Sequence, residues 1–191
     1  MTVHTGTDGD LDAVAERVAA LLKQRQESVG VCEATSGGLI NAALQGVPRA
    51  SSYLRGGMSI YSVVASKGLL PEDVRRQLGR PRDNYQSPPI YHESKKTFCL
   101  VLGRHTRERF GSTWAITESG ATEAEGLPPQ LRGAGVFTAV AVVGPNGEEH
   151  SKLIVLPSDR SPDRRAAMRA FAQAGLDLLE EVLLKSGTSK L

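Results

Sequence analysis

The sequence predicts a single-domain α/β fold in which strands and helices alternate and pack in layers. Short β-rich runs alternate with longer segments whose apolar residues recur at helical spacing. Late in the chain, two apolar β-rich runs flank the turn sequence PNGE at 145–148, which predicts an antiparallel hairpin and therefore a mixed sheet. The 191 residues suffice for one core, and they show no internal repeat or domain linker.

The helices follow from apolar spacing and from the residues at their ends. The first has one apolar stripe, starting at Leu11 and Val14, and Asp10 is its candidate N-cap. The second is expected to stop near Gly46 and Pro48. Together these signals predict helices over 10–26, 37–47, 72–78, 92–111 and 162–184.

The strands and loops fill the intervals between these helices. Strands are expected over 28–34, through Met58 to Tyr61, over 112–119, and within 133–144 and 148–157. The stretch GRPRDNYQSPPIY, 79–91, is rich in proline and polar residues and predicts a loop. We expect a flexible start at 1–10, a domain at 11–185 and a tail at 186–191, so that one domain takes up the chain.

Composition excludes several classes of protein. The net charge is +2 with mixed signs and the aromatic content is 5%, so a nucleic-acid-binding surface is disfavoured. No stretch approaches the roughly 18 apolar residues of a membrane span, and the polar N-terminus lacks a signal-peptide core. Cys32 and Cys99 are far apart, as expected of reduced thiols in a cytoplasmic protein and not of a metal site or disulfide.

The stretch CEATSGGLINAAL places hydroxyls and two glycines between a strand and a helix. Gly37 and Gly38 allow positive φ and close approach of a ligand, and a helix N-terminus attracts anions. Thr35 and Ser36 add hydroxyl donors. The turn is thus a candidate anion-binding site, although glycines here also suit tight strand–helix packing without any ligand.

A second constellation lies in RASSYLRGGMSIYSVVASKGLL, 49–70. Ser52 would become a nucleophile if a desolvated Lys67 took its proton, with Tyr61 orienting that proton. The strand between Ser52 and Lys67 would have to bring them to one of its ends. The alternative is a helix-capping serine and a solvated lysine.

Two further clusters contain groups that bind anions or substrate. Ser119 and Gly120 end a predicted strand in ITESGATEAEG. Arg160 and Arg164 stand at the start of the last helix and could grip a phosphate. The alternative is a capped helix start with solvated arginines.

The order E-x-x-x-G-G-L, S-S-Y, Y-S…K, S-G-A and D-R…R-R resembles the CinA C-terminal domain family, named for competence/damage-inducible proteins. The resemblance runs from about Val14 to Leu184, and the motif sequences are most similar to those of eukaryotic members. It implies a three-layer α/β/α sandwich with a mixed sheet. The characterised members are nicotinamide-nucleotide amidases, so it also implies hydrolysis of nicotinamide mononucleotide to nicotinic acid mononucleotide and ammonia.

Carried over residue by residue, the resemblance implies a catalytic Ser/Lys dyad of Ser52 and Lys67, assisted by Tyr61. It implies a substrate-binding set that consists of Ser36, Gly37, Gly38, Ser119, Gly120, Arg160 and Arg164. No metal or cofactor is implied. The expected partner is a small-molecule nucleotide substrate, not nucleic acid or membrane, and the family often forms homodimers.

The chain departs from the family pattern at several positions. Ala34 stands where the family's E-S-x-T/S-G-G has a serine, and Arg49 stands where it has a glycine. Glu123 and Glu125 replace a glycine–proline turn, and carboxylates there would repel a phosphate. His92 is a candidate acid/base group, although a lone histidine is more often structural. Two interpretations therefore stay open: an amidohydrolase, or a relative that binds a nucleotide or protein partner without turnover.

Overall fold

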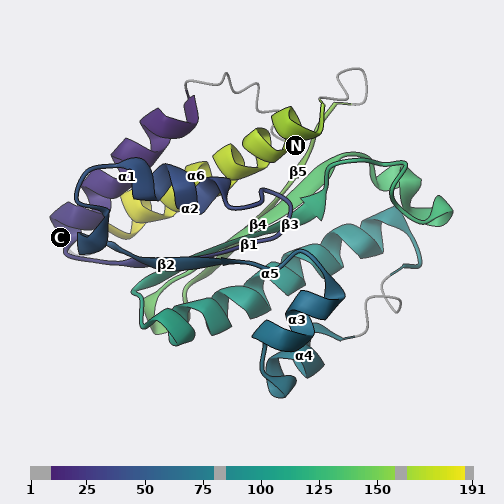
Figure 1. Cartoon of the computed structure of the whole chain (residues 1–191), viewed down its shortest axis with the longest axis horizontal. Helices are drawn as coiled ribbons and strands as arrows, with labels where there is room; N and C mark the ends of the chain where they lie inside the picture. Colours follow the sequence, from purple (N-terminus) through teal and green to yellow (C-terminus); the bar gives the residue numbers. More distant parts are fainter. Residues whose placement is uncertain (1–9, 80–84, 158–162, 188–191) are drawn as a thin grey trace.

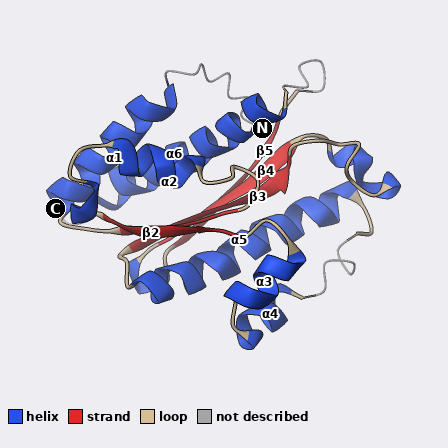
Figure 2. Ribbon diagram, in the orientation of Figure 1, coloured by secondary structure: helices blue, strands red, loops and turns tan. Residues whose placement is uncertain are grey.

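A five-stranded sheet runs through the centre of the molecule and carries helices on both faces (Figures 1 and 2). The computed structural model describes residues 10–79, 85–157 and 163–187. The strands are β1 (Val29–Glu33), β2 (Leu54–Ser59), β3 (Trp114–Ala121), β4 (Phe137–Val143) and β5 (Glu149–Val155). Their order across the sheet is β2-β1-β3-β4-β5.

The sheet is mixed, as the sequence predicts. Strands β2, β1 and β3 are parallel, so their carboxyl ends meet at one edge. Strands β4 and β5 form the predicted antiparallel hairpin, joined by η4 (Pro145–Gly147). Every residue of β1 and β4 is buried, which explains why these segments read as continuous apolar runs and not as alternating ones.

Helices cover the two faces of the sheet in separate groups. One face carries α1 (Asp10–Arg25), α2 (Leu39–Gly46) and α6 (Arg164–Gly187), which pack on one another. The other carries α5 (Pro88–Phe110), with the short α3 (Val63–Leu69) and α4 (Glu72–Leu78) beside it. This confirms the three-layer α/β/α class. Within the described residues, no helix combines the length and apolar character that a membrane crossing needs.

Helix α5 is seated closely on β3 and β4 through one of its faces. Gly103 lies so near the sheet that a Cβ there would stand 2.5 Å from Val143 Cγ2. The Cys99 thiol donates to the carbonyl of Ala139 at 3.3 Å, and the Thr117 hydroxyl donates to the carbonyl of Cys99 at 2.8 Å. These contacts fix where the rest of α5 stands over the strand ends.

The segment after β2 differs from the sequence prediction. The strand ends at Ser59, so Tyr61 lies in the connection that follows it and not on the strand. Lys67 lies inside α3, a helix that the sequence analysis did not predict. The β-branched residues there favour a strand, but the Ser62 hydroxyl accepts from the amide of Ala65 at 3.1 Å and starts a helix instead.

Three other boundaries also differ. Helix α5 begins at Pro88, inside the loop expected at 79–91, because proline fits the first helical turn, where no N–H is needed. Helix α6 runs to Gly187, so it includes the first residues of the expected 186–191 tail. Short 3₁₀ turns occur at η1 (Ala50–Ser52) and η3 (Pro129–Ala134). The start expected to be flexible, 1–10, lies outside the described residues except for Asp10.

We predict that Gly103→Ala lowers the free energy of unfolding relative to Gly68→Ala by about 1–3 kcal/mol, the usual cost of overpacking. Both glycines are helical, so both variants gain the same propensity of up to about 1 kcal/mol. Only at Gly103 does the new Cβ collide with the sheet, since nothing lies within 4 Å of the Cβ position at Gly68. Urea unfolding of the two variants measures the difference, and equal stabilities would contradict the close seating of α5.

Candidate functional site

A cavity of about 800 Å³ opens at the edge of the sheet where the parallel strands end. The strand ends contribute Ala34, Thr35, Ile60, Tyr61, Ser119 and Gly120 to its lining. Helices α3, α4 and α5, the start of α6 and connecting segments, among them residues 121–127 at the end of β3 and after it, contribute the rest of the lining. Ligand sites in open α/β sheets favour this edge, because the connections that leave the strand ends diverge there.

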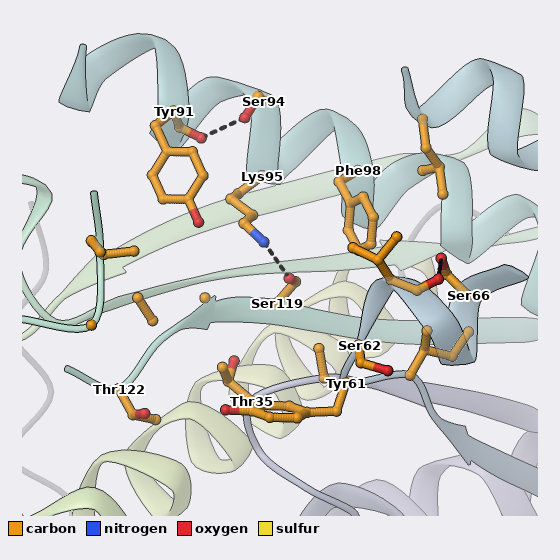
Figure 3. Close-up of a pocket in the computed structure, with 18 of the residues that line it drawn as sticks. Thr35, Tyr61, Ser62, Ser66, Tyr91, Ser94, Lys95, Phe98, Ser119 and Thr122 are labelled. Atoms are coloured by element: carbon orange, nitrogen blue, oxygen red, sulfur yellow. Dashed lines mark hydrogen bonds between the residues drawn. The ribbon is translucent and has the colours of Figure 1, made fainter. Parts of the chain in front are cut away.

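A lysine and a serine are hydrogen-bonded inside this cavity (Figure 3). Lys95 extends from α5 toward β3, and its Nζ lies 3.0 Å from Ser119 Oγ. The periodicity of the two elements explains the meeting. Residues 95, 99 and 103 share one face of α5, and Thr117 and Ser119 share the face of β3 that contacts it. The contacts that seat Cys99 and Gly103 on the sheet therefore also place Lys95.

The surroundings of Lys95 are largely apolar. Its ammonium lies 5.5 Å from the centre of the Tyr91 ring and 5.2 Å from that of Phe98. Burial lowers the pKa of Lys95 below its usual value, although Cys99 and Glu118 oppose the shift. Burial also raises the pKa of Tyr91 to about 12, so this phenol stays neutral. The uncharged form of this amine is therefore more accessible than that of a lysine in water.

Arg164 lines the cavity at its rim and makes two side-chain hydrogen bonds. Arg164 Nη2 donates to the Tyr61 hydroxyl at 2.5 Å, and Arg164 Nη1 donates to Glu123 Oε1 at 2.8 Å. These contacts link the start of α6 to the segments that follow β2 and β3. All three side chains are largely exposed, so an incoming ligand can exchange for either partner of the guanidinium.

The glycine turn after β1 does not open into the cavity. Ser36, Gly37 and Gly38 were expected to bind substrate, but a side chain of the protein already occupies this helix N-terminus. The Glu33 carboxylate accepts from the amides of Gly38, Ile40 and Asn41 at 3.1, 3.0 and 2.8 Å, and from the Ser36 hydroxyl at 2.6 Å. The turn therefore holds a carboxylate of the protein itself, which corrects the prediction that it binds an anionic ligand.

A second buried carboxylate lies beside the first. Glu118 is paired with Glu33 in the register of β3 with β1. It accepts from the Ser36 amide at 2.8 Å, from the Thr138 hydroxyl at 2.6 Å and from the Thr35 hydroxyl. Glu118 thus ties the turn to β3, next to Ser119.

The expected Ser52–Lys67 dyad is not formed. Ser52 precedes β2 and Lys67 follows it, and the six residues of that strand span about 17 Å. The Ser52 hydroxyl donates to the carbonyl of Arg49 at 2.9 Å, and Ser52 is exposed at the far end of the sheet. Lys67 does line the cavity, but it is exposed and so lacks the burial that a lysine base needs.

Other expectations have mixed outcomes. Tyr61, Ser119, Gly120 and Arg164 all line the cavity, whereas Arg160 lies outside the described residues. Asp163 accepts from the amide of Ala166 at 2.8 Å and so caps α6, as the alternative interpretation of this cluster expects.

The remaining titratable candidates do not contribute chemistry here. His92 Nε2 lies 3.1 Å from the carbonyl of Ala134, a structural contact. Burial raises the pKa of Cys32 to about 12 and that of Cys99 further, so neither thiol is a ready nucleophile. Among residues 10–79, 85–157 and 163–187, no group of three or more His, Cys, Asp or Glu side chains is placed to hold a metal ion.

Sequence reasoning missed Lys95 and Glu118. Glu118 is a charged residue directly after the buried run WAIT, and a charge in such a run is the informative exception to the usual pattern. Lys95 carries no comparable signal, because it stands among partly exposed polar residues. Only its helical spacing from the buried Cys99 places it toward the sheet.

The fold and the cavity define an α/β/α domain with a small-molecule-sized site at the carboxyl edge of its parallel strands. The model of the CinA C-terminal domain matches residues 11–183. The chain therefore belongs to the CinA C-terminal domain family. The likeness to eukaryotic members in particular stays a prediction.

Individual relatives agree with this assignment. A CinA-like protein of Prochlorococcus marinus (strain MIT 9313) is 33% identical over 140 residues, 72% of this chain and 29% of the relative. One of Gloeobacter violaceus is 29% identical, over 92% of this chain and 37% of the relative. The chain thus spans about a third of the length of these curated relatives.

Solved structures share the fold at low sequence identity. The competence or damage-inducible protein from Enterobacter asburiae has a TM-score of 0.71 at 17% identity, covering 91% of this chain and 98% of that one. The competence/damage inducible protein CihA from Agrobacterium tumefaciens has a TM-score of 0.70 at 18% identity, covering 96% of this chain and 99% of that one.

We predict that Glu33→Ala lowers the free energy of unfolding by about 3–5 kcal/mol, since it leaves three buried or partly buried N–H groups and the Ser36 hydroxyl without this acceptor. Glu33→Gln keeps one acceptor oxygen and is expected to lose about half as much. Glu93→Ala is the control, because Glu93 is exposed and its ion pair with Lys96, at 2.9 Å, lies on the surface; its change should stay within about 0.5 kcal/mol. If Glu33→Ala proves as stable as the control, the turn does not depend on this carboxylate.

Proposed function

We propose that this chain is an amidohydrolase that deamidates a nicotinamide-type nucleotide, with nicotinamide mononucleotide as its first candidate substrate. The products would be nicotinic acid mononucleotide and ammonia. One observation carries the proposal: the cavity combines cationic side chains suited to a phosphate with a hydroxyl that is hydrogen-bonded to an amine. Membership of the CinA C-terminal domain family is consistent with it.

The charge of the cavity favours an anionic ligand. Three cationic side chains line it beside the Lys95 amine, from Lys67, Arg75 and Arg164, against the single carboxylate of Glu123 among the described lining residues. Arg75 lines the cavity, and its buried Nε has no hydrogen-bond partner in the described part of the chain. A phosphate on the substrate would meet these guanidinium groups.

The size and the aromatic lining suit a nucleotide. A volume of about 800 Å³ lies within the range of small-molecule sites. Tyr61, Tyr85, Tyr91 and Phe98 all line the cavity. Aromatic side chains suit a pyridinium, which as a cation is attracted to an aromatic ring face. The substrate's amide would then lie toward Ser119, and its phosphate toward the arginines at the rim.

The second candidate function is nucleotide binding without turnover. Ala34 lines the cavity at the position where the family pattern has a serine, and its methyl group can neither attack nor hydrogen-bond. In this function the cationic lining would serve recognition alone. The two candidates make the same prediction for binding and opposite predictions for ammonia release.

The test incubates the purified chain with nicotinamide mononucleotide and measures ammonia by an enzyme-coupled assay and the acid product by chromatography. Nicotinamide riboside, which lacks the phosphate, is the matched comparison. Release that is faster with the mononucleotide supports the amidase. Calorimetric binding without release supports the second candidate, and absence of both would sink the two together.

We predict opposite effects for the two partners at the rim. Arg164→Ala should weaken mononucleotide binding about ten- to hundredfold through loss of charge-assisted hydrogen bonds. Glu123→Gln should tighten it roughly two- to fivefold, because the carboxylate competes with the phosphate for Arg164. Calorimetric titration gives both affinities.

The control for this pair is Arg165→Ala, which removes a neighbouring exposed arginine outside the cavity lining. Its affinity should match that of the parent chain. If Arg164→Ala and Arg165→Ala have equal affinities, Arg164 does not contact the ligand.

A further inference from the structure

We propose that Ser119 is the nucleophile of this site and Lys95 its general base, a Ser/Lys pair formed between β3 and α5. For its amide substrate the inference rests on the proposed function. For the reactivity of the serine it rests on geometry alone.

The pair meets the geometric requirement for proton transfer. The Nζ–Oγ distance of 3.0 Å is within hydrogen-bond reach, and Ser119 is only 2% exposed although it lines the cavity. Lys96, Lys152 and Lys185 each pair with a glutamate, whereas within the described ranges no carboxylate lies within 4.0 Å of the Lys95 ammonium. The hydrogen-bond partner of Lys95 is therefore a hydroxyl, whereas those three lysines have a carboxylate as partner.

Burial shifts Lys95 toward the uncharged amine that a base must be, because it lowers the pKa of this side chain. Cys99 and Glu118 act in the opposite direction. Tyr91 and Phe98 flank the Lys95 side chain. The other titratable or charged groups that line the cavity are Tyr61, Lys67 of α3, Arg75 of α4, Tyr85, Glu123 and Arg164.

The pair is held by rigid elements on both sides. On α5, the Cys99 thiol donates to Ala139 and Gly103 presses against Val143, so the helix has little freedom to withdraw the amine. On β3, the Glu118 carboxylate is anchored by hydroxyl and amide donors immediately before Ser119. Such support on regular elements is what keeps reacting groups within a fraction of an ångström of each other.

The reaction balances without any cofactor. Neutral Lys95 takes the hydroxyl proton of Ser119 while Oγ forms a bond to the amide carbon. The resulting tetrahedral adduct breaks its C–N bond, and the Lys95 ammonium gives its proton to the departing ammonia. A water molecule then attacks the Ser119 ester, loses its proton to Lys95 and releases the carboxylic acid, and the proton returns to Ser119.

The test uses a fluorophosphonate, which reports serine reactivity without needing the natural substrate. Ser119 Oγ would displace fluoride at phosphorus and give up its proton to Lys95, and peptide mass spectrometry identifies the modified residue. We expect labelling at Ser119, with a rate that rises with pH through a midpoint below the roughly 10.4 of a free lysine, since only the neutral amine is a base.

Variants of the lysine separate a base from a structural contact. Lys95→Met should slow labelling by about a hundredfold or more, and Lys95→Arg should do the same because a guanidinium stays protonated. Lys96→Met is the matched control on the same helix, and Ser52→Ala is the control for the other serine; both should label like the parent chain. Unfolding curves check that every variant is folded.

The outcomes distinguish this inference from the proposed function. Lys95-dependent labelling of Ser119 without ammonia release from nicotinamide mononucleotide supports the pair and rejects that substrate. Ammonia release that persists in Ser119→Ala supports the amidase and overturns the pair. Labelling that is absent from Ser119, or equally fast in Lys95→Met, overturns the pair as well.

Discussion

The structure of this end of the molecule depends on two buried carboxylates, Glu33 and Glu118, which both need hydrogen-bond donors around them. They lie side by side on neighbouring strands, where like charges in an apolar interior are costly unless donors surround them. The backbone amides at the start of α2 and the hydroxyls of Thr35, Ser36 and Thr138 supply those donors. To do so, the chain must turn sharply after β1, and this turn is what brings Ala34 and Thr35 to the cavity.

The same constraint explains why a glycine-rich turn misled sequence reasoning. Gly37 and Gly38 both have positive φ, as a tight strand-to-helix turn requires, and Gly37 also leaves room for the Met168 side chain of α6. An open helix N-terminus and one occupied by Glu33 have the same local sequence signature. Only the position of the carboxylate in three dimensions separates them.

The fold was largely predictable because its signals are local. Helical spacing located α1 and α6, the PNGE turn located the hairpin, and continuous apolar runs located the buried strands. The site was less predictable because its chemistry depends on elements that are distant in sequence. The Ser52–Lys67 pairing failed because a whole strand separates the two residues, whereas Lys95 and Ser119 meet only once α5 has packed on β3.

The cavity draws its lining from two kinds of structure. Lys95 and Ser119 stand on α5 and β3, which pack on each other, whereas another part of the lining comes from the short helices α3 and α4 beside α5. Substitutions in α3 and α4 therefore alter the shape and charge that a ligand meets while leaving the packing of α5 on β3 intact. In evolutionary terms, this architecture lets the choice of ligand diverge among descendants faster than the scaffold that holds the reactive groups.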